Sequence, residues 1–599
     1  MRNSSSHVLF GLLMMAAIAV SPQLAAAAPP PDFGPNVLVF DPSMSQTDIQ
    51  TAVDAVAAQQ VSNQFGTQRY ALLFMPGTYG TTSNPLIFQV GYYTEVAGLG
   101  ASPADVVVNG TIDVYNQCFS ANNCIALDNF WRSLSNLTIN VAGGTGCQFH
   151  TEFWAVSQAA PMRRVQVNGL VSLMDYCNGS PDFASGGFIA DTQTAGSTII
   201  NGSQQQFLVR NSNIDGWTNG VWNQVFSGVI GAPAQNFPPT AANGNPYTTL
   251  ATSPVTRERP FLYVDSTGAW NVFVPAVQTN TSGTTWASGL TPGSSIPIAE
   301  FLIATPATPV SEITSSLARG GNVIFTPGVY ELNAPIVVTR PDTVVLGLGF
   351  ATLSPQNGTA AMMVVDELGV KIAGLLFDAG PANSPVLLEV GTPSGHKSNP
   401  QDPTTLSDVF FRIGGAAAGK ATTSLVVNSD NVLLDDIWAW RADHGTGVGW
   451  AVNTADTGLV INGDNVTAYG LFVEHYQKYQ VIWNGENGQT IMFQNEMPYD
   501  PPSQQAWMHD GILGYAAYKV ANSVATHQGW GLGSYCFFEL GVPIHASHAF
   551  EGPVTPGVQF HDILTRFLSG SGGIDNVIND VGGAVTAASP GPNYVVSYP

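Results

Sequence analysis

The feature of this sequence that most constrains its fold is an order of motifs that occurs twice. Residues 47–59 have the pattern of a short amphipathic helix, and residues 70–79 form a predicted strand that ends in a Pro-Gly turn. Residues 311–318 and 322–330 repeat this order, so that LLFMPGTY is matched by VIFTPGVY. Two similar beginnings about 250 residues apart indicate an internal duplication.

A glycine-rich segment follows each of the two turns at a similar distance. The interval from Gly77 to Gly98 is 21 residues, and the interval from Gly328 to Gly347 is 19 residues. Each interval is close to one coil of a parallel β-helix. Short β-rich segments broken by Asn, Asp and Gly fill the rest of both halves, for example at 134–141, 207–214, 370–377 and 432–438.

These segments predict an all-β protein made of two tandem, right-handed parallel β-helices. One coil alone cannot bury its inner face, and stacked neighbours supply the core. We place the two β-helices at 33–290 and 300–599, side by side with a cleft between them. The two helices described above would cap the open ends, and the Pro- and Gly-rich stretch 231–306 would cross from one body to the other.

The composition agrees with many short strands and argues against several classes of partner. The chain is 44% hydrophobic and holds 63 Gly and 40 Pro, which is too apolar for disorder and too rich in helix breakers for a helical protein. Its formal charge of −23 repels nucleic acid and anionic membranes, so we expect neither as a partner. The charge also argues against a polyanionic substrate, although an acidic surface can serve solubility alone. We expect a monomer.

Residues 1–28 have the form of a secretion signal. Arg2 supplies the positive charge, and residues 8–20 form an apolar run that is too short to span a membrane. Small residues near Ala28 offer a cleavage site. We therefore expect a secreted, extracellular protein.

The five cysteines leave one thiol free if the others pair in an oxidising compartment. Cys118–Cys124 would close a short loop and is the first choice, and Cys147–Cys177 is a weaker second choice. No Cys/His spacing is typical of a zinc site, and we expect no metal and no cofactor.

The stretch that says most about function is 471–500, which holds Glu474 and Glu496, 22 residues apart. In a parallel β-helix this interval is about one coil, so the second glutamate stacks roughly over the first, with strands ~4.8 Å apart. Repulsion between two such carboxylates raises the pKa of one of them, which is how a general acid is prepared. The alternative is a hydrogen-bonded turn ladder with no catalytic role.

Six short motifs in chain order carry a resemblance to a known family. They are FWAVSQA at 153–159, SGGFIAD at 185–191, QQF at 205–207, WAWRADH at 438–444, EH at 474–475 and QNEMPY at 494–499. On these motifs the chain resembles glycoside hydrolase family 55, the tandem, pectate-lyase-like β-helix β-1,3-glucanases. Near Glu496 the chain departs from the family: Asn495 and Met497 replace small hydroxyl residues, and Asp500 stands where an aromatic is usual. It therefore looks like a divergent member.

The resemblance implies inverting hydrolysis of a β-glucan, with β-1,3 linkages as the first expectation. Glu496 would be the general acid, and Glu474 would orient or activate the attacking water. Gln205 and Gln206 would help to hold that water, with Ser227 as a weaker addition. The two glutamines could instead form an amide ladder.

Several residues near the motifs are candidates for binding the substrate. The aromatic ones are Trp438, Trp440, Trp483 and Tyr499. Each tryptophan could equally belong to the core, and we expect one or two of them to line sugar subsites. Asp443 and His444 are further candidates, although a structural ion pair beside the cleft is the favoured interpretation for both.

Two other functions stay open. A polysaccharide lyase would also suit a β-helix, but that chemistry needs a cationic base and commonly calcium, and Arg441 is the only cation near the motifs. A non-catalytic protein that binds glycans on the same scaffold is the second alternative, against which the intact Glu474 and Glu496 argue.

Overall fold

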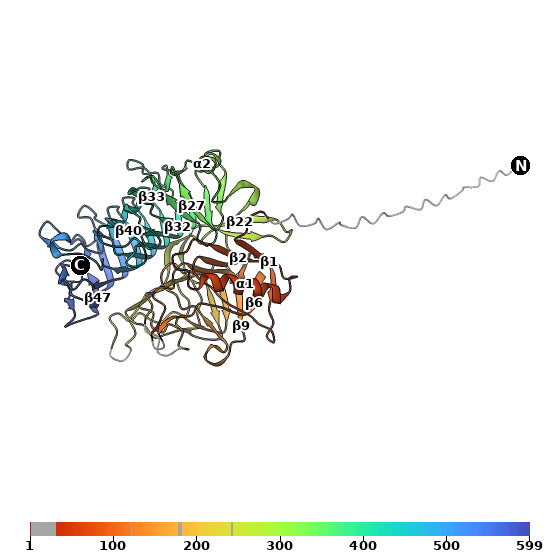
Figure 1. The fold of residues 1–599 in the computed structure, drawn as a ribbon, viewed down its shortest axis with the longest axis horizontal. Helices are drawn as coiled ribbons and strands as arrows, with labels where there is room; N and C mark the ends of the chain where they lie inside the picture. Colours follow the sequence, from red (N-terminus) through yellow and green to blue (C-terminus); the bar gives the residue numbers. More distant parts are fainter. Residues whose placement is uncertain (2–30, 121–122, 178–182, 241–243) are drawn as a thin grey trace.

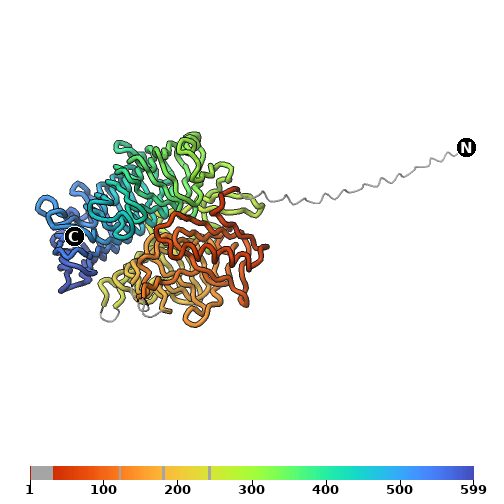
Figure 2. Tube along the Cα trace, in the orientation of Figure 1, coloured from red at the N-terminus to blue at the C-terminus, as the bar shows by residue number. Residues whose placement is uncertain are grey.

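The computed structural model describes residues 1, 31–120, 123–177, 183–240 and 244–599. The predicted secretion signal, residues 1–28, therefore lies outside the described residues apart from Met1. The chain forms two bodies side by side, one from the first half of the sequence (red to yellow) and one from the second (green to blue) (Figure 1). The Cα trace in Figure 2 shows the stacked coils of each body. Within the described ranges, no helix is long and apolar enough to cross a membrane.

The first body is a parallel β-helix in which a 13-stranded sheet runs along the stack. Neighbouring strands on its main path pair in parallel. In order, they are β1 (Val37–Phe40), β2 (Tyr70–Phe74), β5 (Thr94–Gly98), β9 (Arg132–Val141), β11 (Met162–Asn168), β13 (Gly187–Ala190), β16 (Gln206–Arg210), β18 (Asn223–Ser227) and β19 (Tyr247–Leu250).

The second body is a longer parallel β-helix with a second 13-stranded sheet. Its main path is β25 (Phe301–Ala304), β26 (Asn322–Phe325), β29 (Val344–Gly347), β32 (Lys371–Asp378), β34 (Thr405–Ile413), β36 (Leu433–Arg441), β38 (Thr467–Glu474), β40 (Gly488–Glu496), β44 (His527–Phe538), β47 (Val558–Gly570) and β50 (Asn593–Tyr598). An eight-stranded sheet from β28 (Ile336–Val338) to β46 (Phe550–Glu551) forms another wall. The prediction of two parallel β-helices is confirmed.

The core of the second body is built by stacking one apolar residue over the next on successive coils. One such ladder pairs Val409 with Ile437, Ile437 with Leu471, Leu471 with Phe493, and Phe493 with Leu532. All five side chains are buried. Because each coil presents the same inner face to its neighbour, the buried ladder fixes the register of the strands that end at the site.

A short helix packs against the starting coil of each body. α1 (Gln46–Gln60) begins at Ser45, whose hydroxyl accepts a hydrogen bond from the Asp48 amide, and it buries Ile49 and Val53. α2 (Val310–Ala318) buries Ile313 and Leu317. Both helices agree with the predicted ranges to within one residue at each end.

The connection between the bodies is not parallel β-helix. It forms two small antiparallel sheets, one of β20 (Ser253–Thr256) and β23 (Gln278–Thr281), and one of β21 (Phe261–Val264), β22 (Trp270–Pro275) and β24 (Gly293–Pro297). These strands fall within the stretch 231–306 that was predicted to make the crossing.

Aromatic and ionic contacts join the two bodies. The Phe130 ring of the first body lies 4.6 Å from Trp438 of the second, measured between ring centres. Arg163 forms buried ion pairs with Asp408 at 2.6 Å and Asp435 at 2.8 Å. Since a buried charge without its partner is costly, these pairs favour one arrangement of the two bodies.

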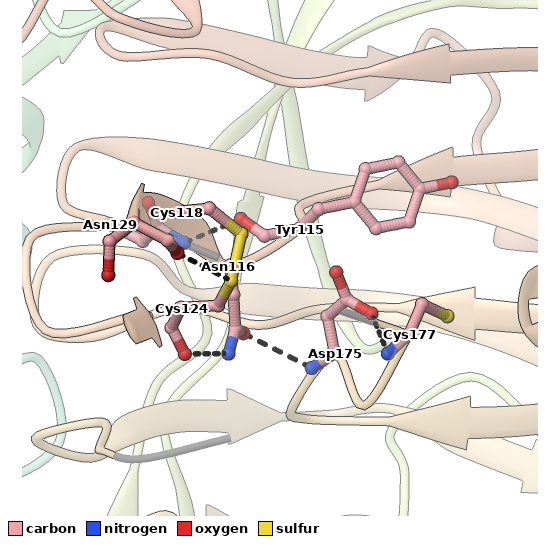
Figure 3. Close-up of a disulfide and its surroundings, with 8 residues drawn as sticks. Tyr115, Asn116, Cys118, Cys124, Asn129, Asp175 and Cys177 are labelled. Carbon is pink, nitrogen blue, oxygen red and sulfur yellow. Dashed lines mark hydrogen bonds between the residues drawn. A yellow bond between two sulfur atoms is a disulfide. The ribbon is translucent and has the colours of Figure 1, made fainter. Parts of the chain in front are cut away.

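Both predicted disulfides are confirmed. Cys118–Cys124 closes the hairpin of β7 (Gln117–Ser120) and β8 (Asn123–Ile125), and Cys147–Cys177 joins two loops of the first body. The first bond and its surroundings are drawn in Figure 3. Cys536 is a free, buried thiol, and burial raises its pKa.

Candidate active site

A cavity of about 560 Å³ opens between the two bodies. The first body contributes Gln158, Ser185, Gln205 and Trp222 to its wall. The second body contributes Trp440, Asp443, His444, Glu474, Glu496 and Tyr499. Small-molecule sites commonly measure about 300–1,000 Å³, so the cavity is large enough for a ligand.

Glu474 and Glu496 lie on neighbouring coils at the ends of β38 and β40. The strand ladder pairs Phe472 with Gln494, two residues before each glutamate. The His475 amide then donates to the Glu496 carbonyl at 2.9 Å, which continues the alignment. Both side chains are almost fully buried and line the cavity. The predicted stacking of the two acids is therefore present in the structure.

Glu474 receives a donor on each carboxylate oxygen. Gln158 Nε2 donates to Oε1 at 2.8 Å, and Trp438 Nε1 donates to Oε2 at 2.8 Å. Gln158 belongs to the first body and is separated from Glu474 by 316 residues, so this hydrogen bond crosses the cleft. Burial raises the pKa of Glu474, and the hydrogen bonds from Trp438 and Gln158 oppose that rise because they favour the ionised form.

Glu496 has a poorer set of donors. Among the described residues only the Tyr499 hydroxyl donates to its carboxylate, at Oε2. Burial, followed by the charge of Glu474, holds the pKa of Glu496 well above its usual range. The charges of two neighbouring carboxylates repel each other, which disfavours ionisation of both at once. Glu474 is the easier of the two to ionise, because two donors stabilise its anion.

Asp443 is the ionised acid of the site. Burial would raise its pKa, but the hydrogen bond from His444 Nδ1 at 3.0 Å and the nearby His475 outweigh that effect and lower the pKa to about 2. Trp440 Nε1 also donates to Asp443, at 3.2 Å. The Asp443–His444 ion pair beside the cleft agrees with the structural interpretation, and both residues also face the cavity.

The two adjacent glutamines, Gln205 and Gln206, lie in different surroundings. Gln205 lines the cavity, and its Oε1 is buried without a hydrogen-bond partner among the described residues. Gln206 does not line the cavity. Its Nε2 donates to the carbonyls of Phe493 and Gly531, and its Oε1 accepts from Tyr535, so it joins the two bodies.

Three further candidates lie outside the cavity. Ser227 is buried and shares a hydrogen bond with Ser253 at 2.9 Å. Trp483 is fully buried in the core of the second body. Trp438 packs in the cluster between the bodies and acts on the cavity through its bond to Glu474. Of the three tryptophans predicted to bind substrate, only Trp440 lines the cavity.

Some cavity residues were not among the sequence-based candidates. Gln158 and Ser185 each lie in one of the six motifs, so a signal for them was present in the sequence. Trp222, Phe537 and Arg566 have no such signal, because they reach the cavity from coils far apart in the chain.

Comparisons with known proteins agree with this geometry. Residues 301–496 match the family model of the LAM55 pectate lyase-like domain. An exo-beta-1,3-glucanase of Streptomyces sp. (strain SirexAA-E / ActE) is 51% identical over 571 residues, which cover 95% of this chain and 90% of that protein.

Two solved structures are similar over almost the whole chain. The structure of sacteLam55A from Streptomyces sp. SirexAA-E has a TM-score of 0.89 and 50% identity, and covers 96% of this chain and 100% of that chain. A glutamate-to-alanine variant of the same protein in complex with glucose has a TM-score of 0.87 and 49% identity, with the same coverage. With this identity along its length, the chain belongs to glycoside hydrolase family 55, as its motifs predicted.

Proposed function

We propose that this glycoside hydrolase is an exo-acting β-1,3-glucanase, which releases sugar from the chain end by inversion with Glu496 as the general acid. The observation that carries the proposal is the pair of buried glutamates in the cavity: among the described residues, Glu474 has two donors and Glu496 has one. The name of the Streptomyces relative and the glucose bound to its variant support the substrate class.

Glu496 supplies the proton to the leaving oxygen of the glycosidic bond. It is the acid for physical reasons: burial and the neighbouring Glu474 both favour its neutral form near pH 7. A raised pKa keeps the proton available for transfer in the transition state, when the leaving oxygen becomes basic.

Glu474 acts on the attacking water together with groups of the facing wall. Gln158, Ser185 and Gln205 come from the first body and line the same cavity as the acid. The unpartnered Oε1 of Gln205 can accept a hydrogen bond from a water molecule. Gln158 holds Glu474 in place, so an ionised carboxylate can take a proton from that water as it attacks the sugar.

The proton count balances over one turnover. Glu496 gives one proton to the departing sugar, and Glu474 takes one from the water whose oxygen bonds to the anomeric carbon. The pair then holds its single proton on Glu474, and exchange through solvent returns it to Glu496. In an inverting enzyme no covalent sugar–enzyme intermediate forms.

We also propose that the protein is secreted. The predicted signal at residues 1–28 supports this, as do the two disulfides, because disulfides persist mainly in oxidising compartments.

The change Glu496→Gln tests the assignment of the acid. We expect hydrolysis of β-1,3-glucan to fall by a factor on the order of 10² or more, because the amide cannot donate the catalytic proton. Proton NMR of the first products of the wild-type enzyme should show the α-anomer from a β-linkage. A variant that keeps wild-type turnover would remove Glu496 from the mechanism, and β-anomer as first product would exclude inversion.

A matched control is Glu331→Gln, which makes the same change on the exposed face of β27 (Val329–Leu332). We expect its activity to equal that of the wild type. Both variants should unfold at the wild-type temperature, which separates a catalytic loss from a loss of folded protein.

A further inference from the structure

The exposed aromatic side chains of this protein are gathered in one region. Among the residues that the structure describes, they are Phe119, Phe149, Tyr176 and Phe183, with exposed fractions of 61%, 58%, 43% and 56%. Three of them belong to loops of the first body and Phe119 lies on strand β7, and we call the four residues the aromatic rim. Single exposed apolar residues are normal, but a group of large ones that share one region marks an interaction surface.

The rim is continuous with the cavity. Phe183 itself lines the cavity. The next residue, Ala184, bridges in parallel to Gln204, so Phe183 lies beside Ser203. Tyr176 covers the same place, because its hydroxyl bonds to Ser203 and a Cβ added to Gly202 would lie 2.7 Å from that hydroxyl.

Disulfides hold the other two rings in the same region. Cys147–Cys177 joins the turn before Phe149 to the residue after Tyr176, with their Cα atoms 5.4 Å apart. Phe149 stacks on His150 with ring centres 3.9 Å apart and an angle of 14° between the planes, which gives a flat, exposed platform.

Phe119 lies on the hairpin that Cys118–Cys124 closes. Asn116 joins this hairpin to the neighbouring loop: its side chain donates to the Cys124 carbonyl at 2.8 Å and accepts from the Asp175 amide at 3.2 Å (Figure 3). The two disulfide-closed loops therefore form one surface beside the cleft.

We propose that the aromatic rim binds the part of a β-1,3-glucan chain that extends beyond the cavity. This rests on the proposed function, since a polymer with its end in the cavity must leave over one of its walls. Exposed ring faces can pack against the C–H groups of sugars. A neutral polymer is not repelled by a protein of charge −23, whereas a polyanion would be. The disulfides reduce the entropy that the loops lose on binding.

The double change Tyr176→Ala with Phe149→Ala tests the rim. Neither residue lines the cavity, so hydrolysis of a β-1,3-linked glucose trisaccharide should keep its wild-type kcat and KM. For a soluble β-1,3-glucan polymer we expect KM to rise on the order of tenfold with kcat unchanged. A polymer KM equal to that of the wild type would overturn the proposal.

Three controls make the result specific. Tyr176→Phe keeps the ring and should keep the polymer KM, and a rise as large as that of the double alanine variant would overturn the role of the ring faces. Leu290→Ala with Val554→Ala removes exposed apolar side chains outside the rim and should leave kcat and KM unchanged with both substrates. Binding without turnover can be measured with the Glu496→Gln variant, by comparing how strongly it binds the polymer with and without the double change. Equal binding in the two cases would overturn the proposal that the aromatic rim binds the polymer.

The trisaccharide separates the two proposals. If the wild-type enzyme does not hydrolyse it or the polymer, the proposed function fails. If the wild type hydrolyses both and the double variant has an unchanged polymer KM, only the aromatic rim fails.

Discussion

In the proposed mechanism, single hydrogen bonds decide which of the two glutamates carries the proton. Both carboxyls are buried, and burial raises the pKa of each. The difference lies in their donors, because Gln158 and Trp438 both donate to Glu474, whereas Tyr499 is the single donor to Glu496 among the described residues. A base and an acid can therefore arise from the same residue type one coil apart.

The change Gln158→Leu should separate positioning from folding. Loss of one donor raises the pKa of Glu474 further, so the acidic limb of the kcat/KM profile should move to higher pH. At the optimum, we expect kcat to fall on the order of 10², as for other lost active-site donors. A pH profile with an unmoved acidic limb would contradict this role.

The matched control is Gln206→Leu, which removes an amide of the same size outside the cavity. Because Gln206 bonds to the backbone of the second body, its loss should lower the free energy of unfolding by about 1–3 kcal/mol. The acidic limb of its pH profile should stay where the wild type has it.

Individual strands explain which predictions from sequence succeeded. Coil length is a property of the repeat, so the interval between Glu474 and Glu496 predicted their stacking correctly. The coil length does not determine the direction of a side chain, because neighbours along a strand point to opposite faces. Gln205 faces the cavity and Gln206 does not, and the QQF motif could not distinguish them. Trp483 is as apolar as Trp440, and only the packing of its strand makes it a core residue.

The strand that carries Glu496 depends on the buried ladder inside it. Phe493 is fully buried between Leu471 and Leu532, three residues before Glu496. Phe493→Ala should lower the free energy of unfolding by about 3–5 kcal/mol, because it leaves a cavity that stacked coils cannot close. Chemical denaturation measures this value. Val554→Ala, at a position that is 75% exposed, should change it by less than about 0.5 kcal/mol.

At the scale of the whole molecule, the joint between the two bodies contains a buried acid, Asp436, whose pKa is raised. Asp436 is fully buried beside Asp408, Asp435 and Arg163, and neither of its carboxylate oxygens has a hydrogen-bond partner among the described residues. Burial, followed by the charge of Asp408, holds its pKa well above the ordinary value of 3.8. Asp436 is therefore protonated in the folded protein at a pH where the unfolded chain has lost that proton.

This acid should make the joint sensitive to pH. Because the pKa of Asp436 is raised on folding, its contribution to stability is full below about pH 4 and is lost as the pH rises toward the folded pKa. Asp436→Asn should remove this loss, so the difference in unfolding free energy between variant and wild type should shift in favour of the variant as pH rises from 4 to 8. A difference that is constant over this range would show that Asp436 is ionised in the folded state.

The hydrogen bond from Gln158 to Glu474 has a consequence for how the protein matures. Since it joins groups 316 residues apart, a newly made chain has no complete site until its second solenoid is finished and docked on its first. Turnover is thus the last property to be gained during refolding, and its time course measures assembly of the two bodies rather than formation of either one.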